Sequence, residues 1–269
     1  MTKPILTLTN IHKTFQKDTA NENHVLRDLS LTVNEGDFIS IIGGNGSGKS
    51  TLLNAIAGTI KIEKGSIHLE QDQITHLSEE DRATNISRVF QDPMMGTAPR
   101  MTVPENLAIA YKRGEKRRLG RTLNNDSLIY FTQLIKDVGL NLENKLHSDV
   151  GLLSGGQRQV IALLMATIKK PKVLLLDEHI AALDPKATEL VMGITDKRIR
   201  ENHLTSLMVT HNMQHAIKYG NRLIMMDEGR VVVDVAGEEK TNLTVPELVN
   251  LFHRKAGKDI VTDEMLLFK

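Results

Sequence analysis

A glycine-rich run near the start of the chain has the residue types and the spacing of a phosphate-binding loop. Residues 43–50 match the pattern G-x-x-x-x-G-K-[ST], in which backbone amides surround phosphate oxygens and glycines permit their close approach. The predicted loop consists of Gly43, Gly44, Asn45, Gly46, Ser47, Gly48, Lys49 and Ser50, followed by Thr51. Lys49 would contact the terminal phosphates, and the Ser50 hydroxyl would ligate Mg²⁺. A functionless glycine-rich turn is the alternative, and the location between an apolar strand and a helix disfavours it.

An acidic pair at the end of an apolar segment supplies the complementary chemistry. Residues 173–176 are Val-Leu-Leu-Leu, and Asp177 and Glu178 follow them directly. Asp177 would hold Mg²⁺ directly or through water, and Glu178 would orient and deprotonate an attacking water. Taken alone, such a pair is structural or helix-capping about as often as it is functional. Beside the glycine-rich run, it predicts a hydrolytic site.

A third short motif has the character of an anion site at the start of a helix. Leu153 is followed by Ser154, Gly155, Gly156 and Gln157, which open a predicted helix. Free backbone amides and a hydroxyl at a helix N-terminus attract negative charge. An ordinary serine cap with a flexible glycine pair is the alternative.

The elements that must position these motifs follow from hydrophobic periodicity. Strands are expected at residues 6–15, 25–33, 38–42, 65–69, 88–90, 173–176, 205–210, 223–227 and 230–235. Helices are expected at residues 49–58, 157–169, 186–202, 213–219 and near 248–252, with a helical stretch over 103–150. Strands that alternate with helices beyond residue 154 predict parallel pairing.

Composition limits the classes of function. The formal net charge is +1 and aromatic residues make up 3 % of the chain, which disfavours nucleic-acid binding. The basic stretch 112–121 is better explained as a solvated linker or helix end than as an RNA site. The chain has no cysteine, and its N-terminus does not resemble a signal peptide. Its apolar runs are strand-sized, so any membrane role is expected to come through a partner.

Together, these motifs resemble those of the ATP-binding-cassette ATPases, along nearly the whole chain. The resemblance implies an α/β P-loop NTPase fold with a mainly parallel core sheet, an antiparallel β lobe and an inserted helical subdomain. A single domain would then span residues 1–269. Its nucleotide-binding core would comprise 1–91 and 171–245, its helical subdomain 92–170, and its C-terminal helix and tail 246–269.

The resemblance also implies ATP and Mg²⁺ as ligands and a head-to-tail homodimer. In that family Ser154, Gly155 and Gly156, together with Gln157, would contact the γ-phosphate bound by the other subunit. Gln91 would touch Mg²⁺ and the attacking water, His211 would hydrogen-bond the γ-phosphate, and Phe15 would stack on adenine. The alternatives are a surface glutamine, one of ten histidines without a special role, and a core phenylalanine.

Two residues depart from the common pattern of the family. Gly44 stands where proline is frequent, and His179 stands where proline usually follows the catalytic glutamate. Neither change removes a phosphate or metal ligand. The effect of His179 on the glutamate is left open.

One cassette without a membrane-spanning segment suits a cytoplasmic subunit on the inner face of the membrane, bound to integral membrane permease subunits. Residues 42–54 and 176–186 are most similar to ATPases of bacterial importers with an extracellular lipoprotein receptor, some associated with tryptophan or tyrosine. We therefore expect an importer of a small solute such as an amino acid. An exporter ATPase and a soluble ATPase outside transport are the alternatives, and the sequence does not identify the substrate.

Overall fold

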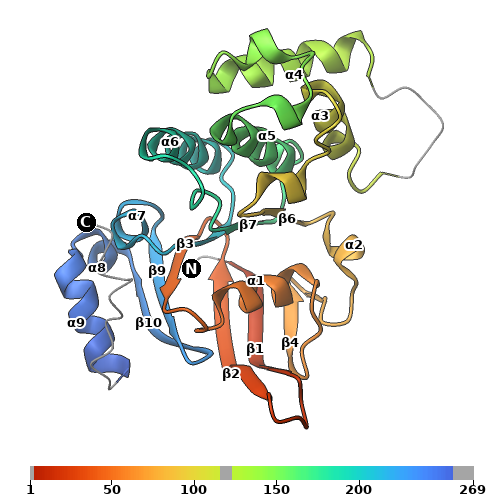
Figure 1. Ribbon diagram of the computed structural model, residues 1–269. Coiled ribbons are helices and arrows are strands. Elements are labelled where there is room, and N and C mark those ends of the chain that lie inside the picture. The colour runs from red at the N-terminus through yellow and green to blue at the C-terminus, as the bar shows by residue number, and fades with distance from the viewer. Residues whose placement is uncertain (1–2, 116–122, 257–269) are drawn as a thin grey trace. The chain divides into compact units, whose positions relative to one another are not determined.

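The computed structural model describes residues 3–115 and 123–256. The chain forms two compact units (Figure 1): the first combines residues 1–82 with 203–269, and the second comprises residues 83–202. The predicted helical subdomain, 92–170, lies within the second unit, which also takes in the strands and the helix on either side of it. The finer division at residues 91 and 171 stays a prediction.

The first unit contains the expected antiparallel sheet. Its strands lie in the order β2-β1-β4-β5, and they are β1 (Pro4–Phe15), β2 (Asn23–Asn34), β4 (Lys64–Leu69) and β5 (Asp72–Gln73). Leu6 and Leu8 on β1 are buried, and so are Leu29 and Leu31 on β2, because alternate residues of a strand point to the same face.

The first unit also contains the parallel strands that lead into the glycine-rich loop. Strand β3 (Phe38–Gly43) is buried along its whole length and pairs in parallel with β8 (Ser206–Val209) and β9 (Arg222–Asp227). Strand β10 (Arg230–Ala236) closes this part antiparallel to β9. The helices of the unit are α1 (Lys49–Ala57), α2 (Glu79–Arg82), α7 (Met213–Lys218), α8 (Gly237–Thr241) and α9 (Val245–Ala256).

Helix α9 shows how the C-terminal part joins this unit. Its Leu248 and Phe252 are buried in a cluster with Leu223 of β9 and Val233 of β10. The spacing of four residues places both side chains on one face of the helix. The apolar face of the predicted C-terminal helix therefore belongs to the core.

The second unit is built around helix α5 (Gly155–Thr167), which is buried from Gln159 to Thr167. Strands β6 (Ile86–Val89) and β7 (Val173–Asp177) pair in parallel. The other helices are α3 (Val103–Tyr111), α4 (Asn125–Val138), α6 (Pro185–Glu201) and the short η1 (Pro93–Gly96), η2 (Leu142–Lys145) and η3 (Val150–Leu152). Helix α3 packs against both α5 and α4, as Figure 1 shows.

These arrangements confirm the predicted mainly parallel core strands, the antiparallel sheet and the helical stretch after residue 103. Only the short elements β5, α2 and α8 and the single-turn helices were not expected. Residues 116–121 of the basic stretch lie outside the described residues, as does the predicted tail from residue 257. Arg113 is no surface charge: its guanidinium donates to Ser87 Oγ and, at 2.8 Å, to the Met165 carbonyl.

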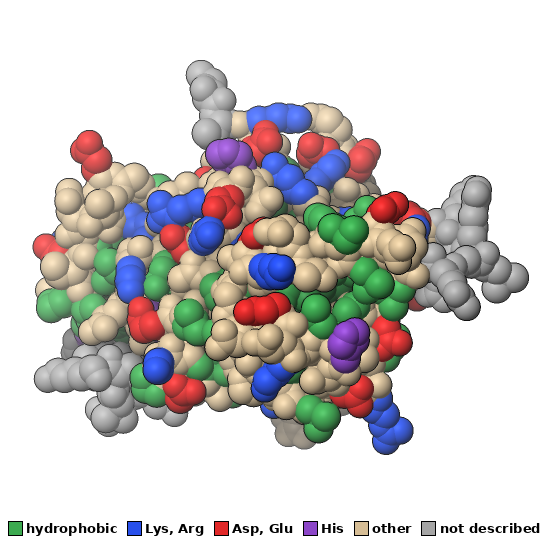
Figure 2. Space-filling model, turned by 90° about the horizontal axis from the view of Figure 1, so that it is seen from above, with side chains coloured by type: hydrophobic (Ala, Val, Ile, Leu, Met, Phe, Trp, Pro, Cys, Tyr) green, Lys and Arg blue, Asp and Glu red, His purple; other side chains and the backbone are tan. Residues whose placement is uncertain are grey.

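Among residues 3–115 and 123–256, no helix has the length and apolarity needed to cross a bilayer. Figure 2 shows one face of the molecule, on which acidic and basic side chains are mixed rather than gathered by sign. This mixing agrees with the formal net charge of +1.

Candidate functional site

The glycine-rich loop begins where β3 ends, and its first glycine is required by close packing. A Cβ on Gly43 would lie 2.3 Å from the Met226 carbonyl oxygen and 2.6 Å from Ser47 Oγ. Gly46 and Gly48 have φ values of 77° and 99°, in the left-handed region that favours glycine. No atom lies within 4 Å of a Cβ added at Gly44. The space beside position 44, where the family often has proline, is therefore open.

Lys49 holds this loop together from within. Its side chain is buried, and Nζ donates to the carbonyls of Gly43 at 2.9 Å and Gly44 at 3.0 Å. The first amides of a helix have no intrahelical partner, and at the start of α1, Lys49, no side chain caps them. Ser47 Oγ is buried without a hydrogen-bond partner among the described residues. Uncapped amides, a buried cation and an unpaired hydroxyl together form a cradle for an anion.

His211 lies at the same edge of the sheet as this loop. Strands β3 and β8 are parallel, Ile41 pairs with Val209, and the Thr210 amide donates to the Ile41 carbonyl at 3.1 Å. Because parallel strands end at one edge, the residues after β3 and after β8 are neighbours there. The first unit thus brings together the loop and His211, the predicted γ-phosphate ligand.

Phe15 is the last residue of β1 and is 38 % exposed, with Lys13 Nζ 5.1 Å from its ring centroid. The alternative of a core phenylalanine is therefore wrong. Its contact with adenine stays a prediction.

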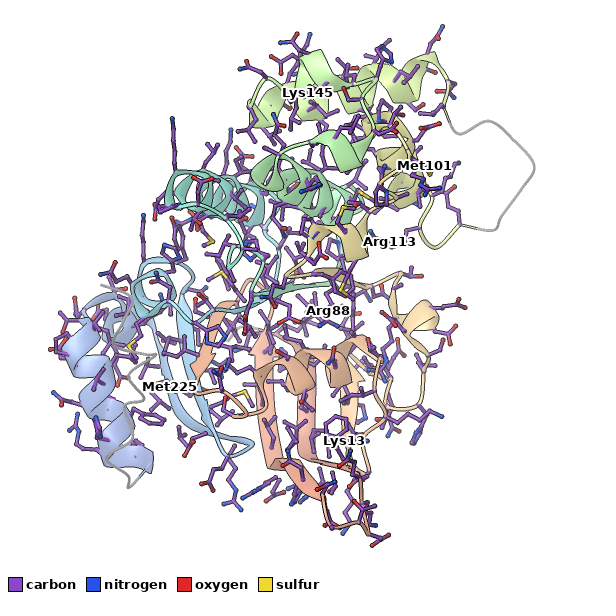
Figure 3. All side chains as sticks on the ribbon, viewed as in Figure 1. Lys13, Arg88, Met101, Arg113, Lys145 and Met225 are labelled. Atoms are coloured by element: carbon purple, nitrogen blue, oxygen red, sulfur yellow. The ribbon has the colours of Figure 1, made fainter. Side chains whose placement is uncertain are left out.

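In the second unit, Asp177 ends β7 and forms an ion pair that the sequence analysis missed. Its Oδ2 lies 2.5 Å from Nη2 of Arg88, and both side chains are nearly buried. Arg88, which Figure 3 labels, belongs to β6. Its guanidinium also packs over the Phe90 ring, 4.7 Å from the ring centroid. The one available signal was an arginine inside a short apolar strand. Arg88 offsets the negative charge of Asp177 at the end of this sheet.

Gln91 is separated from the end of β6 by Phe90 and is exposed. Since β6 and β7 are parallel and Val89 pairs with Leu176, Gln91 and Asp177 leave the sheet at the same edge. The buried Gln159 of α5 donates from Nε2 to the Phe90 carbonyl at 3.2 Å. This bond fixes the backbone immediately before Gln91 to the helix that Ser154 opens.

Ser154 and Gln157 form a reciprocal cap at the N-terminus of α5. Ser154 Oγ accepts from the Gln157 amide at 3.3 Å, and Gln157 Oε1 accepts from the Ser154 amide at 3.2 Å. Gln157 Nε2 also donates to the Leu140 carbonyl at 3.2 Å, while Lys145 Nζ lies 3.5 Å from Gln157 Oε1. The side chain of Gln157 thus links the start of α5 to Leu140 and Lys145. Its contact with a nucleotide stays a prediction.

The glycine pair allows α5 to lie close to the segment after β7. A Cβ on Gly155 would lie 3.3 Å from Leu183 Cδ2, and one on Gly156 would lie 3.3 Å from Ala187 Cβ. Asp184 caps α6, its Oδ1 accepting from the Ala187 amide at 3.0 Å.

Glu178 adopts a left-handed backbone conformation, with φ 46°. It begins a turn in which the Ala181 amide donates to the Glu178 carbonyl at 2.9 Å. A non-glycine residue in this region is held there by its surroundings. The second unit therefore carries Gln91, Asp177, Glu178 and the Ser154 cap, and the first carries the loop and His211.

The donors assigned to a metal suit magnesium. Asp177 offers a carboxylate, Ser50 a hydroxyl and Gln91 an amide oxygen, and Mg²⁺ prefers such hard oxygen ligands.

The chain is similar to known proteins over almost its full length. Residues 26–181 match the family described as ABC transporter. A tyrosine transport ATP-binding protein of Clostridioides difficile (strain R20291) is 47 % identical, covering 92 % of this chain and 98 % of the relative. A spermidine/putrescine import ATP-binding protein of Haemophilus ducreyi (strain 35000HP / ATCC 700724) is 34 % identical over 92 % of this chain, which spans 63 % of that relative.

Solved structures agree with this match. A dimeric ATP-binding cassette in a post-hydrolysis state with ADP and phosphate has a TM-score of 0.73 at 28 % identity, covering 86 % of this chain and 98 % of that one. A cassette in its ADP conformation has a TM-score of 0.75 at 29 % identity, covering 93 % and 99 %. The predicted family and fold class are confirmed: this chain belongs to the ATP-binding-cassette transporter family and is one of its ATP-hydrolysing domains.

Proposed function

We propose that this chain is the ATPase subunit of an importer that carries tyrosine or a related aromatic amino acid. The observation that carries the proposal is the 47 % identity to a tyrosine transport ATP-binding protein over nearly the full length of both chains. Polyamine import has weaker support, since that relative is 34 % identical and longer than this chain.

At the catalytic site, the loop from Gly43 to Thr51 binds the phosphates of ATP through its amides and through Lys49. Lys49 exchanges the Gly43 and Gly44 carbonyls for phosphate oxygens, since its Nζ already lies among the loop's backbone atoms. Phe15 stacks its exposed ring on adenine, and His211 donates to the γ-phosphate. Such preorganised donors stabilise charge where it develops in the transition state.

Glu178 is the general base of the reaction. It takes a proton from the water that attacks the γ-phosphate in line, while Gln91 orients that water. Ser50, Gln91 and Asp177 would hold Mg²⁺, which would neutralise charge on the phosphate oxygens. Arg88 pairs with Asp177 from β6, so this carboxylate is already fixed in position.

A second copy of the chain completes each site. Ser154, Gly155, Gly156 and Gln157 of one copy contact the γ-phosphate held by residues 43–51 of the other, in a head-to-tail homodimer. The capped N-terminus of α5 presents Ser154 exposed, as such a role requires. One of the similar structures is described as dimeric with ADP and phosphate, which supports this assembly.

The transported solute passes through membrane permease subunits, which this chain energises from the cytoplasmic face. Exposed apolar side chains on the second unit suit a permease contact, among them Met95 of η1, 70 % exposed, and Leu152 of η3, 78 % exposed. An extracellular substrate-binding lipoprotein would deliver the solute. Substrate choice resides in these partners.

Uptake in cells tests the proposal. Deleting this gene should abolish uptake of labelled tyrosine at low external concentration, and the intact gene should restore it. A Glu178→Gln copy should not, although it accumulates to the same level. Unchanged tyrosine uptake with loss of spermidine uptake would assign the chain to polyamine import, and efflux of a solute that depends on the chain would assign it to export.

A further inference from the structure

The turn that follows the proposed base is built around an unusual buried histidine. Glu178, His179, Ile180 and Ala181 form the turn closed by the bond from the Ala181 amide to the Glu178 carbonyl. His179 occupies the second position and is 1 % exposed. Histidine is seldom fully buried without a polar partner. The structure supplies that partner on the next helix.

His179 Nε2 lies 3.3 Å from Oγ1 of Thr195, which is itself fully buried on α6. The Thr195 hydroxyl donates its only proton to the Val191 carbonyl, at 2.8 Å. Thr195 Oγ1 therefore acts as the acceptor toward the ring, and Nε2 of His179 carries the hydrogen. The bond has a defined direction, from the turn to α6.

This bond acts where the backbone needs support. Glu178 has a φ of 46°, a conformation that a glutamate keeps only if neighbouring contacts enforce it. The second position of a turn is where proline would fix φ by itself, and histidine does not. A ring N–H bonded to the buried Thr195 hydroxyl restricts the same residue by a different means.

Helix α6 also packs against the motif that Ser154 begins. Val191, which accepts the Thr195 proton, has its Cγ2 3.9 Å from a Cβ placed at Gly156. His179 and Gly156 thus both lie against α6, His179 through its bond to Thr195 and Gly156 through close packing.

We propose that His179 is a positioning residue for Glu178, and that its hydrogen bond to Thr195 holds the base in its reactive orientation. The inference rests on the proposed function of Glu178 as general base. Without the bond, the turn relaxes and the carboxylate no longer meets the attacking water, although the phosphate loop is untouched.

The test uses variants of the purified full-length chain. Thr195→Val removes the acceptor while keeping the shape, and Thr195→Ser keeps the hydroxyl. Thr167→Val is the matched control, because Thr167 is also buried in a helix with its hydroxyl 2.8 Å from the carbonyl four residues earlier. Each variant is assayed for kcat, KM for ATP, thermal midpoint and ATP-dependent dimer formation.

Thr195→Val should lower kcat about 10- to 100-fold with KM within about twofold, as expected when a catalytic group is misplaced and binding is intact. Its ATP-bound dimer should persist longer than that of the unaltered chain. Thr195→Ser and Thr167→Val should keep kcat within about threefold. Combining Thr195→Val with His179→Leu should cost no more than either change alone, because both remove one interaction.

The inference is overturned if Thr195→Val matches Thr167→Val in kcat, or if its loss of kcat accompanies loss of ATP binding and dimer formation. Glu178→Gln separates the two ideas. If Glu178→Gln keeps full turnover, the proposed base itself is wrong. If Glu178→Gln is inactive while Thr195→Val is fully active, only the role of His179 fails.

Discussion

At the end of β7, the proposed chemistry requires the negative charge of Asp177, and the stability of the fold requires a cation beside it. Asp177 is nearly buried, and so is the Arg88 guanidinium that contacts it. A buried carboxylate that loses its cation is strongly destabilising. Arg88 is therefore as necessary to the end of β7 as the acidic pair, Asp177 and Glu178.

Replacing Arg88 with methionine tests this dependence. We expect the free energy of unfolding to fall by about 1–3 kcal/mol, because the carboxylate keeps its burial and loses its partner. Urea unfolding of the metal-free protein measures the change. Adding Asp177→Asn to Arg88→Met should recover part of the loss. A single Arg88→Met variant as stable as the unaltered chain would contradict the account.

The neighbouring glycines 43 and 44 offer a sharper comparison. Alanine at Gly43 would place a Cβ 2.3 Å from the Met226 carbonyl oxygen. A Cβ at Gly44 would have no neighbouring atom within 4 Å. Gly43→Ala should lower the free energy of unfolding by about 2–4 kcal/mol, and Gly44→Ala should change it by less than about 1 kcal/mol. Thermal or urea unfolding checks both. Equal effects would show that the loop rearranges freely.

The sequence predicted the functional residues that lie in short consecutive motifs. It missed those that act through contacts with residues far away in the sequence. The loop, the acidic pair and the Ser154 motif each fit within a few positions. Arg88 meets Asp177 across 89 positions, and Gln159 meets Phe90 across 69. Such contacts depend on strand pairing and helix packing, which spacing alone does not specify. Similarly, His179 was noticed, but its partner Thr195 was not.

At the scale of elements, periodicity predicted the long helices and strands because each buries a continuous apolar face. The missed helices are short and polar: α2 reads Glu-Glu-Asp-Arg and α8 reads Gly-Glu-Glu-Lys-Thr. Their formation depends on tertiary contacts rather than on pattern. Helix α8 illustrates the reason, since its Lys240 is buried.

Lys240 closes the C-terminal end of α7, the helix that follows His211. Its Nζ donates to the carbonyls of Ile217 at 2.7 Å, Tyr219 at 2.9 Å and Gly220 at 2.9 Å. Burial lowers the pKa of Lys240 from 10.5 to about 8. Between these values the unfolded chain binds this proton and the folded chain does not. Lys240 therefore adds a rise in the free energy of unfolding from pH 8 toward pH 10.5.

Lys240→Met should remove this contribution. Urea unfolding at several pH values would show a flatter dependence in the variant than in the unaltered chain over that interval. An unchanged slope would mean that the ammonium keeps its ordinary pKa in the folded protein.

At the scale of the whole molecule, the central claim is that one chain holds only half of each catalytic site. By this proposal, the loop of residues 43–51 binds ATP, and the motif from Ser154 to Gln157 contacts the ATP bound by another copy. The fold supports this reading through the exposed cap of α5 and the uncapped start of α1. A symmetric pair of such chains contains two equivalent sites.

Mixing two inactive variants tests this claim most directly. Lys49→Ala disables the loop of one copy and Ser154→Arg disables the motif of the other, so each variant alone should hydrolyse ATP at a negligible rate. A mixed pair retains one intact site, made from the unaltered loop of one copy and the unaltered motif of the other. An equal mixture should recover roughly a quarter of the original ATPase activity. If the mixture stays as inactive as its components, while both variants fold and associate, each site is contained within one chain and the account is wrong.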